Sequence, residues 1–147
     1  MDRAASGRRR RVTVIDDQED FLELMVDVLS ARHDVVTFSG HELTPDDVVD
    51  SRPDLLVIDL RLARGDLQGL DIVRLARAHR DLQTVPIVVC SGDPFALDDR
   101  AEALSSAGNT AMLLKPFSLE TVEEIVGRGL DGGYATRATH MSAGAAS

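Results

Sequence analysis

The chain has 147 residues, a length that suits one domain of common size and is too short for two well-built ones. Its apolar fraction of 44% supports a buried core, yet no apolar run approaches the roughly 20 residues that a membrane span needs. The basic start is not followed by the apolar stretch of a signal peptide. The single cysteine, Cys90, excludes an internal disulfide and fits a reducing compartment, so we expect a cytoplasmic protein without membrane contact.

The charge of the chain is acidic and unevenly distributed. There are 25 acidic and 16 basic residues, and the net charge of −9 argues against direct binding of nucleic acid by the whole surface. The first 11 residues nevertheless carry a net charge of +4, from five arginines and one aspartate. Of the 16 basic residues, 15 are arginine, and Lys115 is the one lysine of the chain.

The order of apolar patterns along the chain predicts three regions. Residues 1–10 are expected to form a flexible basic arm, residues 11–130 a folded domain, and residues 131–147 a flexible tail rich in Gly, Ala, Ser and Thr. Within the domain, short apolar strands alternate with segments of helical periodicity or helix-start signals. In chain order, the expected strands are 11–16, 33–38, 54–60, 86–90 and 110–114, and the expected helices are about 19–30, from 44, 69–80, 98–106 and 118–128.

Five strand–helix units in this order favour an α/β fold. Runs such as LLVI and IVV are apolar on both faces, as the strands of a parallel sheet covered by helices on each side must be. Right-handed crossovers then predict a doubly wound, five-stranded parallel sheet. Ligands bind such sheets at the carboxyl ends of the strands, near the switch point of the strand order.

Polar residues stand at the carboxyl ends of four of the five predicted strands. These residues are Asp16 and Asp17 at the end of the first strand, Asp59 at the end of the third, Ser91 at the end of the fourth and Lys115 at the end of the fifth. Carboxylates placed close together repel one another and are suited to holding a hard divalent cation such as Mg²⁺. A carboxylate can also accept a phosphoryl group, whose negative charge a lysine and a hydroxyl can stabilise.

The motifs of the chain resemble those of a response-regulator receiver domain, the phospho-accepting partner of histidine kinases in two-component signalling. The resemblance covers nearly all of residues 11–130 and implies a flavodoxin-like (CheY-like) (βα)5 three-layer sandwich. The motifs that carry it, in the order of the family, are VTVIDD (12–17), LLVIDL (55–60), CSG (90–92), SSAG (105–108) and LLKPF (113–117).

The resemblance also implies a role for each residue at the strand ends. Asp59 would be the phosphoacceptor, Ser91 the switch hydroxyl, and Lys115 the phosphate-contacting lysine, aimed by a cis peptide bond to Pro116. An Mg²⁺ ion would be held by the following ligands: the carboxylates of Asp16, Asp17 and Asp59, and the backbone carbonyl of Arg61.

By the same resemblance, the function would be that of a stand-alone signalling domain rather than an enzyme. It would receive phosphate from a histidine kinase or a phosphotransfer protein and lose it by slow self-dephosphorylation. Phosphorylation would shift an equilibrium on the face formed by the fourth helix, fifth strand and fifth helix, and so control an unknown downstream protein. Family members often dimerise through this face, so a homodimer is one expected state.

Several positions differ from the common pattern of the family. Met112 occupies the place of a usual aromatic residue, and the loops after Asp59 and after Ser91 are longer than usual. Arg61 and Asp93 stand two residues after Asp59 and Ser91, so they could form an ion pair across the mouth of the site. Two alternatives follow: a constitutive scaffold in which Met112 weakens switching, and a phosphohydrolase, which is disfavoured because Arg61 replaces its usual second acid.

Overall fold

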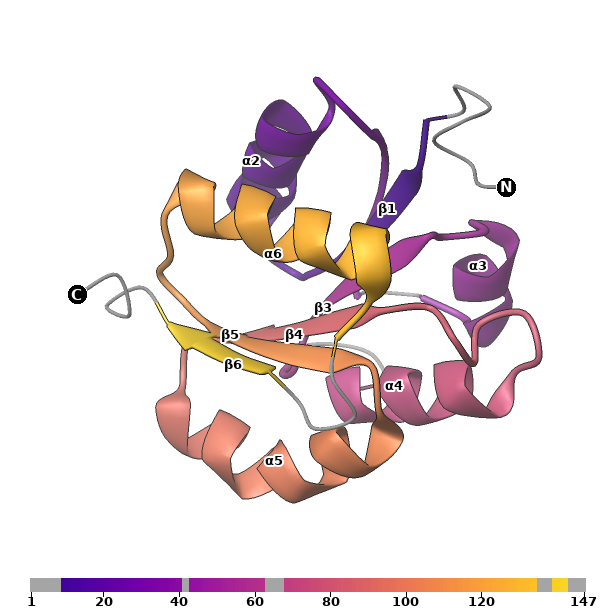
Figure 1. Cartoon of the computed structure of the whole chain (residues 1–147), viewed down its shortest axis with the longest axis vertical. Coiled ribbons are helices and arrows are strands. Elements are labelled where there is room, and N and C mark those ends of the chain that lie inside the picture. The colour runs from indigo at the N-terminus through magenta and orange to yellow at the C-terminus, as the bar shows by residue number, and fades with distance from the viewer. Residues whose placement is uncertain (1–8, 41–42, 63–67, 135–138, 143–147) are drawn as a thin grey trace.

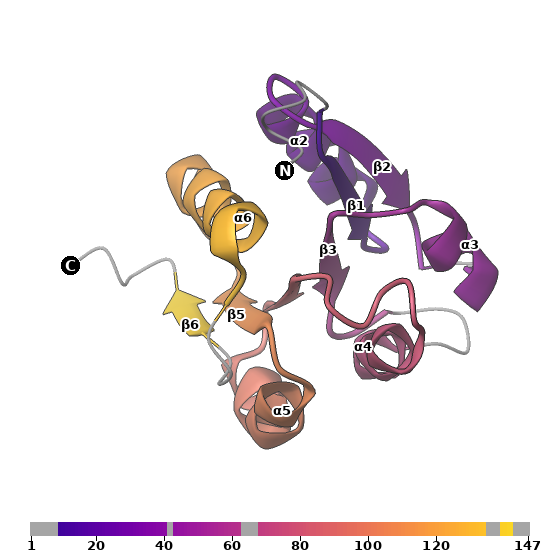
Figure 2. The same ribbon diagram turned by 45° about the vertical axis from the view of Figure 1, so that its right-hand side comes forward.

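A parallel sheet forms the middle layer of the molecule, with helices on both faces (Figures 1 and 2). The structure, a computed structural model, describes residues 9–40, 43–62 and 68–134 and the backbone of residues 139–142. The strands are β1 (Arg11–Ile15), β2 (Asp34–Phe38), β3 (Leu55–Asp59), β4 (Ile87–Ser91), β5 (Thr110–Leu114) and β6 (Thr139–Ser142). They lie in the order β2-β1-β3-β4-β5-β6, and every neighbouring pair is parallel.

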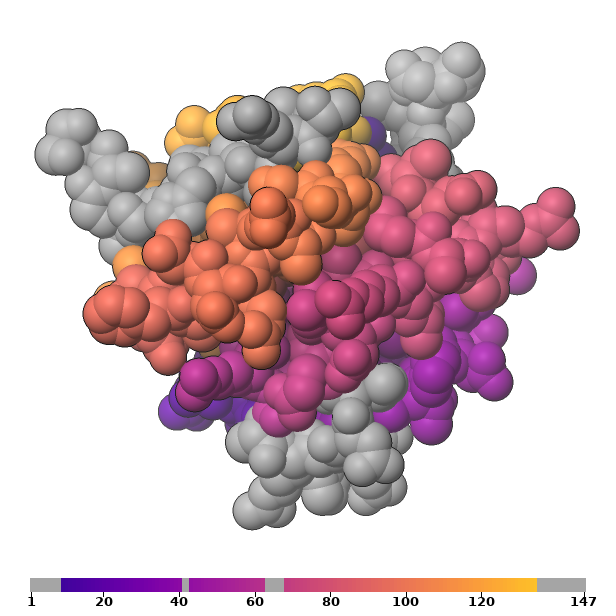
Figure 3. All heavy atoms as spheres, turned by 90° about the horizontal axis from the view of Figure 1, so that it is seen from below, coloured from indigo at the N-terminus to yellow at the C-terminus, as the bar shows by residue number. Residues whose placement is uncertain are grey.

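Five helices connect the strands and cover the sheet. Their bounds are α2 (Glu19–Leu29), α3 (Pro45–Asp50), α4 (Gly69–Ala78), α5 (Pro94–Ala107) and α6 (Leu119–Gly132). Figure 1 shows α2 and α6 on one face, and α3, α4 and α5 on the other. Seen from below in Figure 3, α4 and α5 lie side by side. Within the described parts of the chain, no helix combines the length and apolar character that a membrane crossing requires.

The prediction of a doubly wound parallel sheet with the flavodoxin-like strand order is confirmed. The sheet has one strand more than the five predicted, because β6 comes from the segment that was expected to be a flexible tail. Helix α6 also continues to Gly132, beyond its predicted end at 128. Helix α5 begins at Pro94 rather than at 98, because the Asp93 carboxylate caps it by accepting the backbone N–H of Phe95 at 2.9 Å.

The core consists of two apolar layers, one on each face of the sheet. Alternate residues of β3 supply them: Leu55 and Val57 pack with α2 and α6, whereas Leu56 and Ile58 pack with α3, α4 and α5. Cys90 is fully buried in the first layer, and burial raises the pKa of its thiol far above the ordinary value. Met112 is buried in the second layer with 5% of its surface exposed, so it serves as a core residue.

Arginines stabilise the helix ends at the edge of the sheet opposite the strands' carboxyl ends. Helices α2, α3, α5 and α6 have no basic residue in their last turn, although the carbonyls there favour a positive charge. The carbonyls at each of these helix ends instead accept from an arginine that lies outside that helix. Arg9 donates to the Ser30 carbonyl at the end of α2 at 2.5 Å, and Arg11 to the Ser51 carbonyl at the end of α3 at 2.7 Å. Arg77 donates to the Ala107 carbonyl of α5 at 3.1 Å, and Arg10 to the Leu130 carbonyl of α6 at 2.7 Å. Arg9 and Arg10, expected in the flexible arm, are therefore attached to the domain; residues 1–8 lie outside the described part.

Arg77 makes the largest of these carbonyl networks. Its guanidinium also donates to the carbonyls of Gly108 at 2.9 Å, Asn109 at 3.0 Å and Val85 at 2.8 Å. The planar group carries five N–H donors in a fixed arrangement, which a lysine cannot reproduce. Arg77 thereby joins the end of α5 to the loops that precede β4 and β5. This network gives a physical reason why position 77 carries an arginine and not a lysine.

Candidate functional site

Asp59 ends β3 at the carboxyl edge of the sheet, beside the switch point where the strand order turns from β1 to β3. Its side chain is 14% exposed, so the carboxylate is largely enclosed yet reachable from solvent. One oxygen accepts the backbone N–H of Arg61 at 3.2 Å, which fixes the orientation of the group. The predicted phosphoacceptor thus lies where a doubly wound sheet binds its ligands.

Asp16 lies next to this carboxylate, at the end of the neighbouring strand β1. Its side chain is fully buried, and its oxygens accept the Lys115 ammonium at 2.7 Å and the backbone N–H of Gln18 at 2.9 Å. The Lys115 ammonium also lies 3.5 Å from an Asp59 oxygen. The ends of β1, β3 and β5 therefore bring two carboxylates and one ammonium together, as the sequence predicted.

The ammonium of Lys115 lies beside an aromatic ring. The peptide bond between Lys115 and Pro116 is cis, as the resemblance implied. The ammonium lies 4.1 Å from the ring centroid of Phe21, and the rings of Phe21 and Phe117 meet in a T-shaped arrangement at a centroid distance of 5.9 Å. Phe21 was not predicted as a site residue. Its place on the apolar stripe of a helix gave no sign of this contact, because the lysine is distant in sequence.

The charges of the site perturb one another. Burial and the negative charge of Asp16 raise the pKa of Asp59 to about 6, although Lys115 and the Arg61 N–H act in the opposite direction. Burial disfavours the charged form of Lys115, but its hydrogen bond to Asp16 and the charges of Asp59 and Asp16 outweigh that effect and raise the pKa of the ammonium. The site therefore has more negative charge than Lys115 alone compensates.

Asp17 lies in the same loop, but its carboxylate is turned toward the end of β2. A Cβ added at Gly40 would lie 2.7 Å from an Asp17 oxygen, so the glycine leaves room for this carboxylate. In the described residues, no three His, Cys, Asp or Glu side chains are arranged as a closed metal site. The prediction that Asp16, Asp17 and Asp59 together with the Arg61 carbonyl hold Mg²⁺ remains a prediction.

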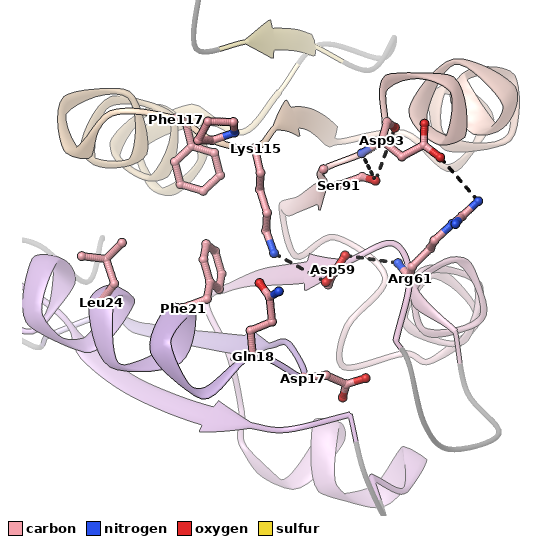
Figure 4. Close-up of a pocket in the computed structure, with 12 residues that line it drawn as sticks. Asp17, Gln18, Phe21, Leu24, Asp59, Arg61, Ser91, Asp93, Lys115 and Phe117 are labelled. Carbon is pink, nitrogen blue, oxygen red and sulfur yellow. Dashed lines mark hydrogen bonds and ion pairs between the residues drawn. The ribbon is translucent and has the colours of Figure 1, made fainter.

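Ser91 and Asp93 form the opposite side of the site, where β4 leads into α5. Ser91 is 2% exposed, and its hydroxyl accepts the backbone N–H of Asp93 at 3.0 Å. The Asp93 carboxylate lies 3.5 Å from the Arg61 guanidinium, which confirms the ion pair that the spacing allowed (Figure 4). This pair joins the loop after Asp59 to the start of α5.

A pocket of about 700 Å³ opens onto these groups. Figure 4 shows a charged half, with Asp59, Arg61, Asp93 and Ser91, and an apolar half, with Phe21, Leu24 and Phe117 on one side of the Lys115 side chain. The Gln18 side chain lies between the two halves. Gln18 and Leu24 were not predicted as site residues, and Leu24 is 40% exposed. The lining residues are Asp17, Gln18, Phe21, Leu24, Asp59, Arg61, Ser91, Gly92, Asp93, Lys115, Pro116 and Phe117.

Comparisons with known proteins agree with this geometry. A chemotaxis protein CheY homolog of Campylobacter jejuni is 24% identical over 132 residues, which are 85% of this chain and 98% of the relative. A protein-glutamate methylesterase/protein-glutamine glutaminase of Rhodospirillum rubrum is 27% identical over 115 residues, or 74% of this chain, but the chain spans only 30% of that protein.

Solved structures show the same fold. The chemotaxis response regulator CheY4 of Vibrio cholerae has a TM-score of 0.71 at 19% identity, with 82% of this chain and 98% of CheY4 covered. NtrX from Brucella abortus has a TM-score of 0.73 at 22% identity, with 84% of this chain and 27% of NtrX covered. The model of the response regulator receiver domain matches residues 12–127, nearly the whole of the folded part. The chain belongs to the family of response regulator receiver domains.

Proposed function

We propose that this receiver domain accepts a phosphoryl group on Asp59 and signals through phosphorylation-dependent binding to another protein. The observation that carries the proposal is the convergence of two carboxylates and one ammonium, Asp59, Asp16 and Lys115, beside a pocket that Asp59 and Lys115 line. Asp59 is the more accessible of the two acids, since Asp16 is fully buried. It is therefore the acid that a phosphodonor can reach.

In the proposed transfer, an Asp59 carboxylate oxygen attacks the phosphorus of a phosphohistidine. The new O–P bond forms as the P–N bond breaks, and the electron pair leaves with the donor's imidazole nitrogen. Attack requires the ionised carboxylate, so a pKa of about 6 leaves Asp59 mostly competent near neutral pH. Lys115 would turn its charge toward the phosphoryl oxygens, and the Ser91 hydroxyl would exchange its Asp93 contact for one of them.

The residues at the site also fit a magnesium ion. They offer carboxylate oxygens, the donors that Mg²⁺ prefers, and burial together with the negative charge of Asp16 raises the pKa of Asp59, a cost of the ionised form that a nearby cation would relieve. We propose that the ligands are Asp16, Asp17, Asp59 and the Arg61 backbone carbonyl. When bound, Mg²⁺ neutralises charge on the phosphoryl oxygens. Asp17 supplies this site by turning its carboxylate away from Gly40.

The proposed partners follow from the same chemistry. A histidine kinase or a phosphotransfer protein supplies the phosphoryl group, and an effector protein reads the phosphorylated state from the face of α5, β5 and α6. Turnover is limited to slow self-dephosphorylation, so the domain acts as a signalling element of the cytoplasm rather than as an enzyme. A homodimer of the phosphorylated form through that face belongs to the proposal.

The test is labelling by acetyl phosphate, a small phosphodonor that needs no cognate kinase. The purified chain is incubated with it in Mg²⁺ or in EDTA, and phosphoprotein is quantified over time for wild type, Asp59→Asn and Asp50→Asn. Asp50 is an exposed aspartate in the last turn of α3, so Asp50→Asn is the matched control. We expect Mg²⁺-dependent labelling of wild type and the control, and none of Asp59→Asn. Equal labelling of Asp59→Asn would show that the acceptor is wrongly assigned.

A further inference from the structure

The outer edge of β5 is occupied by a strand from the same chain. β6 pairs in parallel with β5, and Ala111 lies opposite Thr139 while Leu114 lies opposite Ser142. Figure 2 shows β6 beside β5, between the levels of α5 and α6. The face that we propose for partner binding therefore has the chain's own C-terminal strand at its centre.

The turn after α6 directs the chain toward this edge. Gly133 has a φ of +76°, a left-handed conformation that glycine adopts readily, and its N–H donates to the Gly129 carbonyl at 2.9 Å. The next residue, Tyr134, donates its backbone N–H to the Asn109 side chain at 2.7 Å. Asn109 directly precedes β5. The chain is thus held beside the first residue of β5 shortly before β6 begins.

Tyr134 is anchored firmly at this point. Its hydroxyl donates to the Ile125 carbonyl at 2.6 Å, and its ring fits over Gly129, where an added Cβ would come within 2.7 Å of the ring. Asn109, with a φ of +49°, donates its side-chain amide to the Thr84 carbonyl at 2.9 Å. Both partners of the contact are therefore fixed to the body of the domain, and the start of β6 is positioned by them.

The backbone groups of β5 show what β6 covers. The Lys115 N–H donates to the Ser91 carbonyl of β4 at 2.8 Å. Because alternate residues of a strand point their N–H groups in opposite directions, the amides of Ala111 and Leu113 also face β4, and those of Met112 and Leu114 face β6. Without β6, these outward groups would form an open edge on an uncharged strand, a template for pairing with another chain.

We infer that β6 is an intramolecular occupant of the β5 edge, which prevents a second copy of the chain from pairing there until β6 is released. The strand has four residues, so its pairing is short, and it lies at the edge of the sheet with β5 as its neighbour, so its release leaves the pairing of β1 to β5 intact. Its covalent link gives it a high effective concentration at the edge. This inference does not depend on phosphorylation, and its test requires none.

The first test is amide hydrogen exchange of the wild-type chain, resolved by residue. We expect slow exchange at both sets of β5 amides: Ala111 and Leu113, which face β4, and Met112 and Leu114, which face β6. If Met112 and Leu114 exchange at the rate of open amides while Ala111 and Leu113 stay protected, β6 does not occupy the edge and the inference is wrong.

The second test uses two proline substitutions in β6. In the register that places Met112 opposite His140, the N–H of Met141 faces β5 and that of His140 faces solvent. Proline removes this group, so Met141→Pro should disrupt pairing while His140→Pro, the matched control, should preserve it. Met141→Pro should speed exchange at Met112 and Leu114 by at least about tenfold, with Ala111 protected as in wild type.

Sedimentation velocity of the same three proteins then tests the consequence. Met141→Pro should self-associate as its concentration rises, at concentrations where wild type and His140→Pro sediment as monomers. The β4-facing amides of Ala111 and Leu113 report that the sheet of the variant is intact. The inference is overturned if Met141→Pro, with an open edge by exchange, remains monomeric, or if His140→Pro behaves in the same way as Met141→Pro.

Discussion

Replacing Asp59 with asparagine is expected to stabilise the metal-free protein. The ionised carboxylate is crowded by burial and by the charge of Asp16, and the raised pKa of Asp59 already includes the attraction of Lys115. Removing the charge therefore removes a net unfavourable interaction. Asparagine has nearly the same shape, and its carbonyl oxygen can still accept the Arg61 N–H that now bonds the carboxylate at 3.2 Å.

The magnitude follows from the difference between the ordinary pKa of 3.8 and the value of about 6 in the folded protein. Each pKa unit corresponds to about 1.4 kcal/mol, which sets an upper limit of about 3 kcal/mol. Solvent reaches the carboxylate and screens its charge, so we expect a gain of about 1–2 kcal/mol in the free energy of unfolding of Asp59→Asn above about pH 7.

The pH dependence has a definite sign. Because folding raises the pKa of Asp59, the protonated acid favours the folded state, and this contribution is lost as pH rises through about 6. Wild type and Asp59→Asn should therefore be equally stable below about pH 4, and the difference between them should open between about pH 4 and 7.

Urea denaturation followed by far-UV circular dichroism measures this difference in EDTA across that pH range. Repeating it in Mg²⁺ adds a second expectation: the ion should stabilise wild type and stabilise Asp59→Asn less, because one proposed ligand has lost its charge. An Asp59→Asn protein that is less stable than wild type at about pH 8 in EDTA, or a difference that does not vary with pH, would refute the electrostatic reasoning.

Three further predictions follow from other contacts. Arg77→Ala leaves several carbonyls without their donor and should lower the free energy of unfolding by about 2–4 kcal/mol in urea denaturation, whereas Arg74→Ala, an exposed arginine of the same helix, should change it by less than about 0.5 kcal/mol. Phe21→Leu removes the ring below the Lys115 ammonium and should destabilise the chain by about 1 kcal/mol; an unchanged melting temperature would contradict the cation–π contact. Arg61→Ala and Asp93→Asn should each shorten the lifetime of the phosphorylated protein by a similar factor, with no additive effect when combined, because both open one ion pair at the mouth of the site; additive effects would show that the residues act separately.

The sequence was sufficient to predict the alternation of strands and helices and the convergence of Asp16, Asp59 and Lys115. Both predictions rest on rules that hold locally: buried parallel strands are apolar on both faces, and their carboxyl ends share one edge. The Arg61–Asp93 pair was also predictable, because Arg61 stands two residues after Asp59 and Asp93 two residues after Ser91, at strand ends expected to share one edge of the sheet.

Other features depend on contacts that sequence order does not reveal. The cation–π contact of Phe21 joins distant segments, and the guanidinium caps of Arg9, Arg10 and Arg11 become visible only when the helix ends are placed in space. β6 was missed because a short polar segment after two glycines is typical of a tail, and the contact of Tyr134 with Asn109, which holds the chain beside β5, is not visible in the sequence. The early start of α5 was missed although Asp93–Pro94 is the same kind of signal as Thr44–Pro45.

The central claim, that Asp59 is the phosphoacceptor, is tested most directly by locating the phosphoryl group on the protein. The full chain is treated with acetyl phosphate and Mg²⁺, and mass spectrometry of the intact protein and of its peptides determines how many groups it carries and on which residue. We predict one phosphoryl group, on Asp59, that is absent when EDTA replaces Mg²⁺. A phosphoryl group on any other residue, or a chain that remains unmodified in Mg²⁺, would contradict the proposed function.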